Sequence, residues 1–563
     1  MSREQDRCGS ALALTQKWRP IGNRYEKDSS MKKLLAALAM GASFALAVPA
    51  VHAATPKDTL VEAWHMDDII SLDPAEMYEL STYEVNGNVY DTLVAINPHN
   101  TGDILKKAAL SWTVSDDGKT FTFKLRPNQK FASGNPLTAA DVVYSYQRLT
   151  ALNKAPAFLI QDFGISTDNM NTTLKAVDDM TFQLTVDQAY APSFVINKLC
   201  ATNFAIVDSV LVKSKEAKQA DGTNDWGNGW LKTTSAGSGP FKIDEWKPNE
   251  SISMSVNPNY WGPKPKLKRV FYRHIAEEAS QRLLLESGDV DIARNLSADQ
   301  LDGVRKKGGF KFPGTAQNTN LYMGLNTKNQ YLSNPKVREA IRYLVDYQGL
   351  AKTALREGWI INQTFLPNGV LGYVDSNPYK LDIAKAKKLL TEAGFADGFP
   401  LTVNVASTEQ SRMDIAQSLQ QTMAKVGIKL QILASDQKTV ITNYRARKHD
   451  MALLTWGIDY FDPNTNMAFV VNTDNSDTPK SKPLAWRNGW MNEEFNKQAN
   501  ELLFVTDTAK RKAGYQAMIK AWQPISPFVM MFQQNWVAAV SPKVHNFFIG
   551  PSNEMTQYDN VYK

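Results

Sequence analysis

The chain has 563 residues, of which 43% are hydrophobic and 21% are charged, and its formal net charge is +6. Residues 1–53 contain eight Lys or Arg and four Asp or Glu, so the 510 residues that follow carry a net charge of only +2. This balance excludes a general polyanion-binding surface, and with it nucleic acid as the partner. A chain of that length is too long for one core and predicts two or three domains.

The segment 31–53 has the three parts of a secretory signal peptide. Lys32 and Lys33 precede an apolar run from Leu34 to Val48, and the segment ends in Val-His-Ala, with small residues at the positions that a signal peptidase reads. The apolar run is about 15 residues long, shorter than the roughly 20 that a membrane-spanning helix needs. We therefore predict export to the periplasm, with cleavage after Ala53.

The 30 residues before Met31 are polar and mixed in charge, and they place the signal segment inside the chain. We predict that translation starts at Met31 and that residues 1–30 are an untranslated-like extension. Cys8 lies in this extension, so Cys200 is the one cysteine of the mature chain, residues 54–563. One cysteine cannot form an internal disulfide, and no cysteine follows the apolar run to carry a lipid anchor. We expect a soluble protein between two membranes.

Strands are predicted where apolar and polar residues alternate. Phe121–Arg126 alternates as a half-buried strand does, and the turn at Asp116–Lys119 predicts a β-hairpin over residues 112–126. Thr181–Val186 repeats the strand pattern.

Helices are predicted where the period changes to that of an amphipathic helix. Thr138, Asn334 and Asp382 are good N-cap residues, and Gly394 and Gly427 are good terminators. The four predicted helices span residues 139–146, 336–345, 383–393 and 411–426. A strand over 428–432 follows the last helix directly, which is α/β character. The fold class is therefore α/β or α+β, with long mixed sheets.

Short motifs occur in a fixed order along nearly the whole mature chain. They are Leu72–Ala75, Asn88–Leu93, Asp116–Arg126, Pro136–Ser145 with Arg148, Gly237–Phe241, Asn257–Trp261, Asn334–Ile341 and Ala384–Leu390. On these motifs the chain, from about Leu60 to Val544, resembles family 5 of the bacterial extracellular solute-binding proteins. That group contains dipeptide-, oligopeptide- and nickel-binding components of ABC importers. The glycines of Gly237–Phe241 are interpreted as a backbone shape that only glycine permits.

The resemblance implies a two-lobed periplasmic binding protein fold of type II, similar to cluster C, with mixed sheets and hinge-joined lobes. Two crossing strands join the lobes, and a ligand cleft lies between them. Carried onto this chain, lobe I comprises residues 54–315 and 532–563, and lobe II comprises residues 316–531. The implied function is capture of a short peptide and its delivery to the permease subunits of an ABC importer, whose ATPases drive uptake. We expect a monomer.

The resemblance also implies a ligand site after a tryptophan. In peptide-binding members an aspartate three residues beyond such a tryptophan pairs with the ligand's α-ammonium, and Asp459 stands at that spacing from Trp456. A desolvated ammonium needs an opposite charge, and Trp456 and Tyr460 could add apolar walls and cation–π contact. The alternatives are a turn or cap aspartate for Asp459 and a core position for Trp456.

Four further residues are candidates for contact with the ligand. Arg412 lies near the position of the family's carboxylate-binding arginine and could form a bidentate pair, although a surface arginine at a helix N-terminus is the alternative. Tyr322 and Asn326 lie four apart on the strand after the predicted hinge and so share a face, with a core position as the alternative for Tyr322. Tyr78 is the corresponding candidate on lobe I.

Rival functions have weaker support in the sequence. A periplasmic hydrolase is disfavoured because the mature chain has neither a His-Glu-x-x-His spacing nor a Gly-x-Ser-x-Gly elbow. A non-peptide ligand in the same transport role stays open: an oligosaccharide, an opine, or a metal or haem complex. We predict no enzymatic activity, no cofactor and no resident metal.

Overall fold

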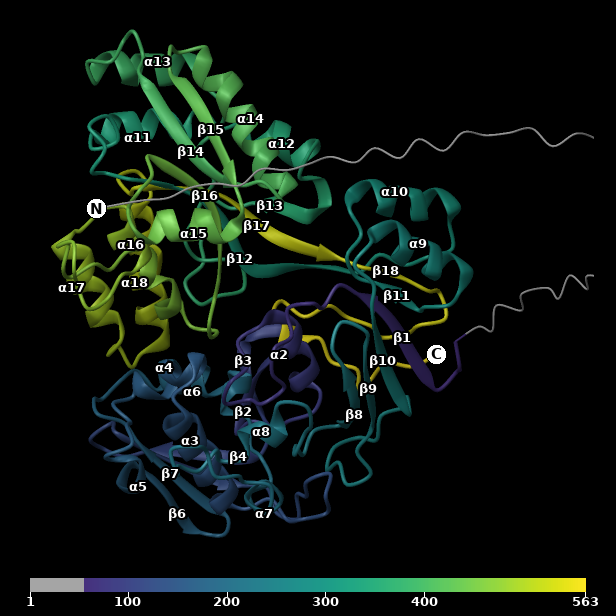
Figure 1. Cartoon of the computed structure of the whole chain (residues 1–563). Coiled ribbons are helices and arrows are strands. Elements are labelled where there is room, and N and C mark those ends of the chain that lie inside the picture. The colour runs from purple at the N-terminus through teal and green to yellow at the C-terminus, as the bar shows by residue number, and fades with distance from the viewer. Residues whose placement is uncertain (1–54) are drawn as a thin grey trace, which may run out of the picture. The chain divides into compact units, whose positions relative to one another are not determined.

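The computed structural model describes residues 55–563, so the predicted signal segment 31–53 and the extension 1–30 lie outside the described residues. No helix within the described range is long and apolar enough to cross a membrane. We keep the names lobe I (54–315 and 532–563) and lobe II (316–531) as defined by the sequence; these exact boundaries stay a prediction. Figure 1 labels the elements.

Lobe I is built around a mixed six-stranded sheet. In spatial order its strands are β18 (Ala539–Val540), β11 (Ile292–Ala293), β1 (Thr59–Trp64), β10 (Arg269–His274), β9 (Ser251–Val256) and β8 (Phe241–Lys247). The central strand β1 runs parallel to both β10 and β11, whereas the outer pairs are antiparallel. The helices associated with this part are α2 (Leu80–Gly87), α9 (Glu278–Ser287) and α10 (Ala298–Lys307).

A second part of lobe I has its own antiparallel sheet, in the order β4 (Ala109–Val114), β5 (Thr120–Leu125), β7 (Thr181–Thr185) and β6 (Leu174–Asp178). The hairpin of β2 (Val94–Asn97) and β3 (Asn100–Lys106) precedes it. Its helices are α3 (Ala139–Leu152), η1 (Ala155–Ala157), α4 (Phe158–Gln161), α5 (Met170–Thr173), α6 (Pro192–Leu199), η2 (Thr202–Phe204), α7 (Ser209–Lys213) and α8 (Asn228–Leu231). The hairpin predicted over residues 112–126 is confirmed as β4–β5.

Two of the family motifs of lobe I meet in a buried ion pair. Arg148, on α3, donates to both carboxylate oxygens of Asp73, at 3.1 and 2.8 Å, and neither side chain is exposed by more than 1%. Arg148 Nε also donates to the carbonyl of Trp226 at 2.7 Å. A bidentate pair of this kind fixes geometry as well as charge, so the motif around Asp73 is held against helix α3.

Lobe II is built around a second mixed six-stranded sheet. Its order is β13 (Trp359–Ile361), β17 (Phe528–Val537), β12 (Gly314–Leu325), β16 (Met451–Gly457), β14 (Pro400–Ala406) and β15 (Lys429–Ser435). Its helices are α11 (Pro335–Arg342), α12 (Tyr347–Lys352), η3 (Arg356–Gly358), α13 (Ile383–Glu392), α14 (Gln410–Ala424), α15 (Gln437–Arg445), η4 (Pro463–Phe469), α16 (Leu484–Arg487), α17 (Glu493–Leu502) and α18 (Thr508–Trp522). Another short helix, η5 (Asn553–Met555), lies in the C-terminal tail.

Alternate residues of β12 enter different cores, as the two-residue period of a strand requires. Leu321 and Met323 pack with residues of α11, α13 and α14, whereas Tyr322 packs with Tyr444, Phe469 and other aromatic side chains on the opposite face. Both faces of this sheet are therefore buried.

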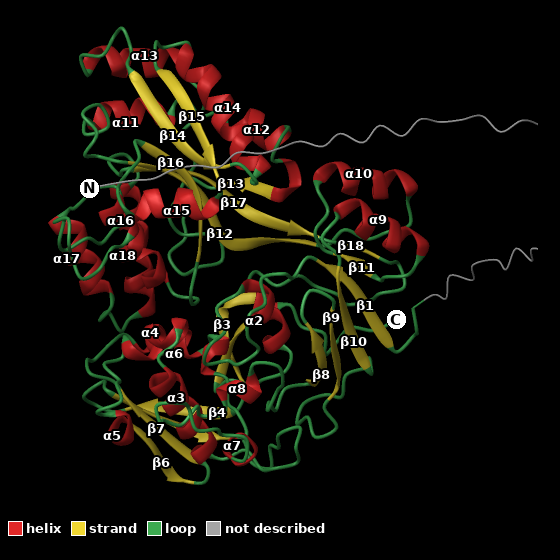
Figure 2. Cartoon of the chain, viewed as in Figure 1, coloured by secondary structure: helices red, strands yellow, loops and turns green. Residues whose placement is uncertain are grey.

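The strands β12 and β17 carry the chain between the two sheets. They pair antiparallel from Gly324↔Phe528 to Gly314↔Val537, and a further bridge joins Lys311 to Val540 in β18. Figure 2 shows β12 and β17 side by side, running towards β11 and β18. Two adjacent extended segments are the connection that a hinge between lobes needs.

The predicted helices are present, with differences in length. Helix α3 continues to Leu152, six residues beyond its predicted end, and α14 ends at Ala424, two residues before its predicted end. The side chains of Asn334 and Asp382 accept hydrogen bonds from the backbone of α11 and α13, and Thr138 forms a capping box with Asp141. The helix predicted to reach Val345 ends at Arg342, because the chain turns there so that Leu344 and Val345 enter the core.

The glycines of the Gly237–Phe241 loop have a different role from the predicted one. Neither Gly237 nor Gly239 has a positive φ. Instead, a Cβ at Gly237 would lie 2.1 Å from the carbonyl oxygen of Val89, and one at Gly239 would lie 2.7 Å from the Val89 carbonyl carbon. The backbone of the loop packs directly on that of the Asn88–Leu93 motif, so a side chain is excluded by contact and not by backbone conformation.

Candidate functional site

A cavity of about 220 Å³ lies where the two lobes meet. Lobe I lines it with side chains from residues 78–107 and 197–202, lobe II with residues 457–461, and the C-terminal tail with residues 552–557. Three of the predicted ligand residues, Tyr78, Asp459 and Tyr460, are in its wall.

Asp459 follows the end of β16, in the loop that leads into η4. One carboxylate oxygen accepts a 2.5 Å hydrogen bond from the hydroxyl of Tyr78, and the other contacts the Thr465 hydroxyl at 3.3 Å. The backbone N–H of Asp459 donates to that same Thr465 oxygen at 3.1 Å. The carboxylate is thus held by one hydroxyl from each lobe.

The electrostatic state of Asp459 is unusual for a surface loop. Burial raises the pKa of its carboxyl, and the hydrogen bonds from Tyr78 and Thr465 oppose that rise only in part. Within residues 55–563 it forms no ion pair; Lys198, whose charge also lowers this pKa, pairs instead with Asp162 at 2.6 Å. A partly buried carboxylate without a cation is costly, and it is suited to bind one.

Tyr78 of lobe I and Tyr460 of lobe II line the same cavity as Asp459. The Tyr78 ring meets Phe158 edge-on at 6.3 Å, and burial, with the negative charge of Asp459, raises the pKa of its hydroxyl. Tyr460 is 6% exposed, and its ring lies 6.1 Å from Phe194 and 4.9 Å from the Lys198 ammonium. The cation–π partner of Tyr460 is therefore a lysine of lobe I.

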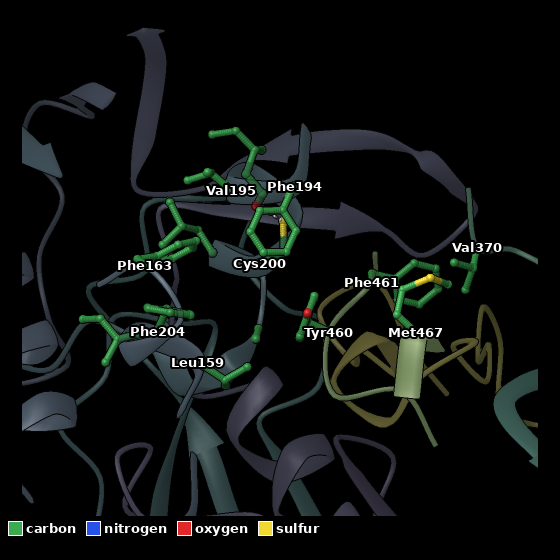
Figure 3. Close-up of a cluster of buried hydrophobic side chains, with 14 of the residues drawn as sticks. Leu159, Phe163, Phe194, Val195, Cys200, Phe204, Val370, Tyr460, Phe461 and Met467 are labelled. Carbon is green, nitrogen blue, oxygen red and sulfur yellow. Dashed lines mark hydrogen bonds between the residues drawn. The ribbon is translucent and has the colours of Figure 1, made fainter. Parts of the chain in front are cut away.

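Figure 3 shows Tyr460 between two groups of buried side chains. One group comes from lobe I: Leu159, Phe163, Phe194, Cys200 and Phe204. The other comes from lobe II: Val370, Phe461 and Met467. The lobes therefore share an apolar contact beside the cavity.

A buried ion pair anchors the loop that carries Asp459. Arg511, on α18, donates to both oxygens of Asp462, at 2.6 and 2.7 Å, and neither side chain is exposed to solvent. Asp462 also caps η4 by accepting from the N–H of Asn464. Asn197 of lobe I donates to Asp462 at 3.3 Å. The loop is therefore held within lobe II by the ion pair between Asp462 and Arg511, and against lobe I by the hydrogen bond from Asn197.

Arg412 does not line this cavity. It is 6% exposed at the start of α14, where it donates to Gln437 at 3.0 Å and approaches Glu409 at 3.5 Å. Burial lowers its pKa, and its Nε has no hydrogen-bond partner among residues 55–563. It is neither an exposed surface arginine nor a neighbour of Asp459 in the cavity wall; its ligand role stays a prediction.

Trp456, Tyr322 and Asn326 also lie outside the cavity wall. Trp456 packs edge-on against Phe469 at 6.3 Å, and Tyr322 is 1% exposed inside the aromatic core. The prediction that Asn326 shares a strand face with Tyr322 is wrong, because β12 ends at Leu325, before Asn326. Its amide donates to the carbonyls of Arg447 and His449, and so holds that turn.

Three charged residues of the wall were not singled out from the sequence: Lys107, Asp91 and Glu554. Asp91 lies within the Asn88–Leu93 motif, whose pattern indicates the family resemblance but not a ligand contact. Lys107 is the only cation among the cavity-lining residues, and it forms no hydrogen bond through its side chain and no ion pair in the described chain. No pattern in the sequence distinguishes Glu554. Within residues 55–563 no grouping of His, Cys, Asp and Glu could hold a metal ion.

Comparison with known proteins gives a consistent result. The family model described as bacterial extracellular solute-binding proteins, family 5 middle, matches residues 104–478. The chain is 29% identical over 533 residues to the probable D,D-dipeptide-binding periplasmic protein DdpA of Escherichia coli strain K12, covering 94% of this chain and 98% of that protein. It is 26% identical over 525 residues to the glutathione-binding protein GsiB of the same strain, covering 91% and 96%.

Solved structures share the fold. The periplasmic binding protein DppA of Helicobacter pylori, solved with the peptide STSA, has a TM-score of 0.71 at 25% identity and covers 90% of this chain and 98% of its own. NikA of Brucella suis, solved with Fe(III)-EDTA, has a TM-score of 0.74 at 21% identity and covers 90% and 100%. These matches confirm the predicted two-lobed α/β fold with mixed sheets, and DdpA, GsiB and DppA are named as binding proteins.

Proposed function

The chain belongs to family 5 of the bacterial extracellular solute-binding proteins, and on that premise we propose that it binds a short peptide between its lobes in the periplasm and delivers it to an ABC importer. The relatives named for dipeptide and glutathione binding support a peptide ligand. They are described as periplasmic or as binding proteins, which is consistent with the predicted export of residues 54–563 after cleavage at Ala53.

The observation that carries the proposal is the carboxylate of Asp459. It lines a cavity shared by both lobes, its pKa is raised by burial, and no cation pairs with it. A carboxylate has about four lone-pair positions, and the Tyr78 and Thr465 hydroxyls occupy two of them. The α-ammonium of a peptide supplies the missing charge and up to three further donors.

The opposite end of a peptide needs a cation. Lys107 is in the wall of the same cavity and its ammonium forms no hydrogen bond or ion pair in the described chain, whereas Arg412 is outside that wall. We therefore assign the ligand's carboxylate to Lys107 in preference to Arg412. The cavity of about 220 Å³ is smaller than the roughly 300–1,000 Å³ of drug-sized sites, which favours a peptide of two or three residues over a longer one.

Ligand capture follows from the contacts between the lobes. Besides the Tyr78–Asp459 bond, the N–H of Ala191 in lobe I donates to the carbonyl of Leu503 in lobe II at 2.7 Å. A ligand that bridges Asp459 and the lobe I wall adds to these contacts and so shifts the lobes towards the closed form. The closed monomer then docks on the permease subunits, whose ATPases drive uptake.

Native mass spectrometry of residues 54–563, purified from periplasm and then denatured to release bound molecules, tests the proposal. Masses of di- or tripeptides that leave with the folded protein are the expected result. A single non-peptide mass, such as a sugar, an opine, or a metal or haem complex, would overturn the peptide assignment while leaving the transport role in place. Turnover of the released molecule by the purified protein would contradict a pure binding role.

A further inference from the structure

The lobe I side of the cavity holds polar groups that a simple zwitterionic peptide leaves without partners. They are the side chains of Asp91, Asn553 and Glu554. Asp91 follows α2, and Asn553 and Glu554 form the start of η5 in the C-terminal tail. We call these three side chains the tail wall.

The tail wall is fixed by a close contact of backbones. Helix α2 packs against η5, and a Cβ at Gly87 would lie 2.5 Å from the carbonyl oxygen of Glu554. Asn88 Nδ2 donates to the carbonyl of Thr556, and the N–H of Tyr558 donates to Asn88 Oδ1. The tail is therefore held at this position by α2 and by the residue that follows it.

One carboxylate oxygen of Asp91 accepts three hydrogen bonds, and the other accepts none among the described residues. Its Oδ2 accepts from Gln129 at 2.9 Å, from Ser238 at 2.8 Å and from the Trp261 indole at 2.8 Å, all of them neutral donors. Its Oδ1 is buried and has no hydrogen-bond partner among the described residues, and the whole side chain is 1% exposed. An ionised oxygen left in this state is costly unless a ligand reaches it.

Glu554 is similarly short of partners. Within the described chain its only side-chain hydrogen bond comes from the Ser552 hydroxyl, and it forms no ion pair. Burial raises the pKa of its carboxyl. Beside it, the amide nitrogen of Asn553 is also buried without an acceptor. Two carboxylates and one amide donor of the same wall thus lack the partners that buried polar groups require.

The charges of the cavity wall do not balance for a neutral peptide. Asp459 and Lys107 match the ammonium and the carboxylate of a zwitterion, and Asp91 and Glu554 then remain without a cation. We propose that the tail wall is a subsite for a second cationic group of the ligand, so that the protein prefers peptides with a lysine or arginine side chain. This inference rests on the proposed peptide function and deepens it.

Calorimetric titration of the mature chain with four synthetic peptides tests the preference without any substitution. The probes are Ala-Ala, Ala-Lys, Lys-Ala and Ala-norleucine, the last of which keeps the four-carbon chain of lysine without its ammonium group. We expect Ala-Lys or Lys-Ala to bind at least about tenfold more tightly than Ala-norleucine, because a charge-assisted contact in a desolvated site is strong. Equal affinities for the charged and the neutral peptides would overturn the subsite.

The variant Glu554→Gln tests whether the preference for lysine peptides comes from the tail wall. We expect it to reduce the ratio of the affinity for the lysine peptides to that for Ala-norleucine to within about threefold. Asp559→Asn is the matched control, since Asp559 lies in the same tail and outside the cavity wall. A charged-to-neutral affinity ratio that is as large in Glu554→Gln as in the native protein contradicts the assignment of the subsite to the tail wall. If none of the four peptides binds, the proposed peptide function itself fails, which is a distinct result.

Discussion

The hydroxyl of Tyr78 donates a 2.5 Å hydrogen bond to the carboxylate of Asp459, and the bond joins residues 381 positions apart, one in each lobe. This contact favours the ionised form of Asp459 against the effect of burial. It also ties the loop that follows β16 to lobe I. One hydrogen bond thus couples the charge of the candidate ligand residue to the approach of the lobes.

Replacing Tyr78 with phenylalanine removes the hydrogen bond and leaves the ring in place. Because that bond lowers the pKa of Asp459, the carboxyl of the variant protonates at a higher pH than in the native protein. We expect peptide affinity to fall between about pH 7.5 and about pH 5 in both proteins, and more steeply in Tyr78→Phe. Titration calorimetry at the two pH values measures this. Tyr331→Phe is the control, because the Tyr331 hydroxyl makes no hydrogen bond within residues 55–563. Parallel pH profiles for Tyr78→Phe and the native protein would contradict the coupling.

Replacing Asp462 with asparagine leaves the guanidinium of Arg511 buried without its counterion. Removal of one partner of a buried pair typically costs about 3–5 kcal/mol, so the urea midpoint of unfolding should fall markedly. The double variant Asp462→Asn with Arg511→Met should recover part of that loss, because it removes the uncompensated charge. Glu392→Gln, which breaks an exposed pair with Lys336, serves as the control and should leave the midpoint unchanged. A single variant as stable as the native protein would show that the pair does not hold the loop.

Glu62 makes the free energy of unfolding depend on pH. Burial, with Glu84 nearby, raises the pKa of Glu62 to about 7, although Arg294 opposes the rise. The folded protein then keeps this proton up to about pH 7, whereas the unfolded chain releases it near its ordinary value of about 4.5. The resulting stabilisation is complete below that ordinary value and is lost as the pH rises through about 7.

The variant Glu62→Gln has no proton to release at this position. We expect the free energy of unfolding of the native protein to decrease between about pH 4.5 and about pH 7, by up to about 1.4 kcal/mol per pH unit. In Glu62→Gln this decrease should be absent or much smaller. Thermal unfolding followed across the interval checks it, and identical slopes for the two proteins would rule out Glu62 as the source.

Replacing Gly237 with alanine places a Cβ 2.1 Å from the carbonyl oxygen of Val89. Backbone atoms must then move, and overpacking of this kind costs typically about 1–3 kcal/mol. A Cβ at Gly358 meets nothing within 4 Å, so Gly358→Ala is the matched control. Denaturant unfolding should separate the two variants, and equal midpoints would contradict the close-contact role of Gly237.

Local signals predicted the elements with the clearest patterns, a minority of those in the fold. The β4–β5 hairpin, the capped starts of α3, α11 and α13, and the strand after α14 were all recognisable from alternation, caps and terminating glycines. The end of α11 was predicted three residues too late, because the burial of Leu344 and Val345 depends on tertiary packing and not on local periodicity.

The ligand-binding roles of the candidate residues stay predictions. Asp459, Tyr460 and Tyr78 line one cavity, whereas Arg412 and Tyr322 are buried outside its wall. Side-chain direction at these positions depends on how the sheet packs, which a single sequence does not reveal. Lys107 and Glu554 reach the cavity from segments far apart in the chain, so no local pattern could have joined them.

The most direct test of the account is titration of Asp459→Asn with the peptide that co-purifies with the native protein, or with Ala-Ala if none does. The amide keeps the size of the side chain and removes its charge, so the fold should persist. We predict that affinity falls by more than about tenfold, since the ligand ammonium loses its buried counterion. The control Asp414→Asn changes a half-buried carboxylate on α14 outside the cavity wall and should bind as the native protein does. Unchanged affinity in a folded Asp459→Asn protein would contradict the ammonium-binding role on which the proposed function depends.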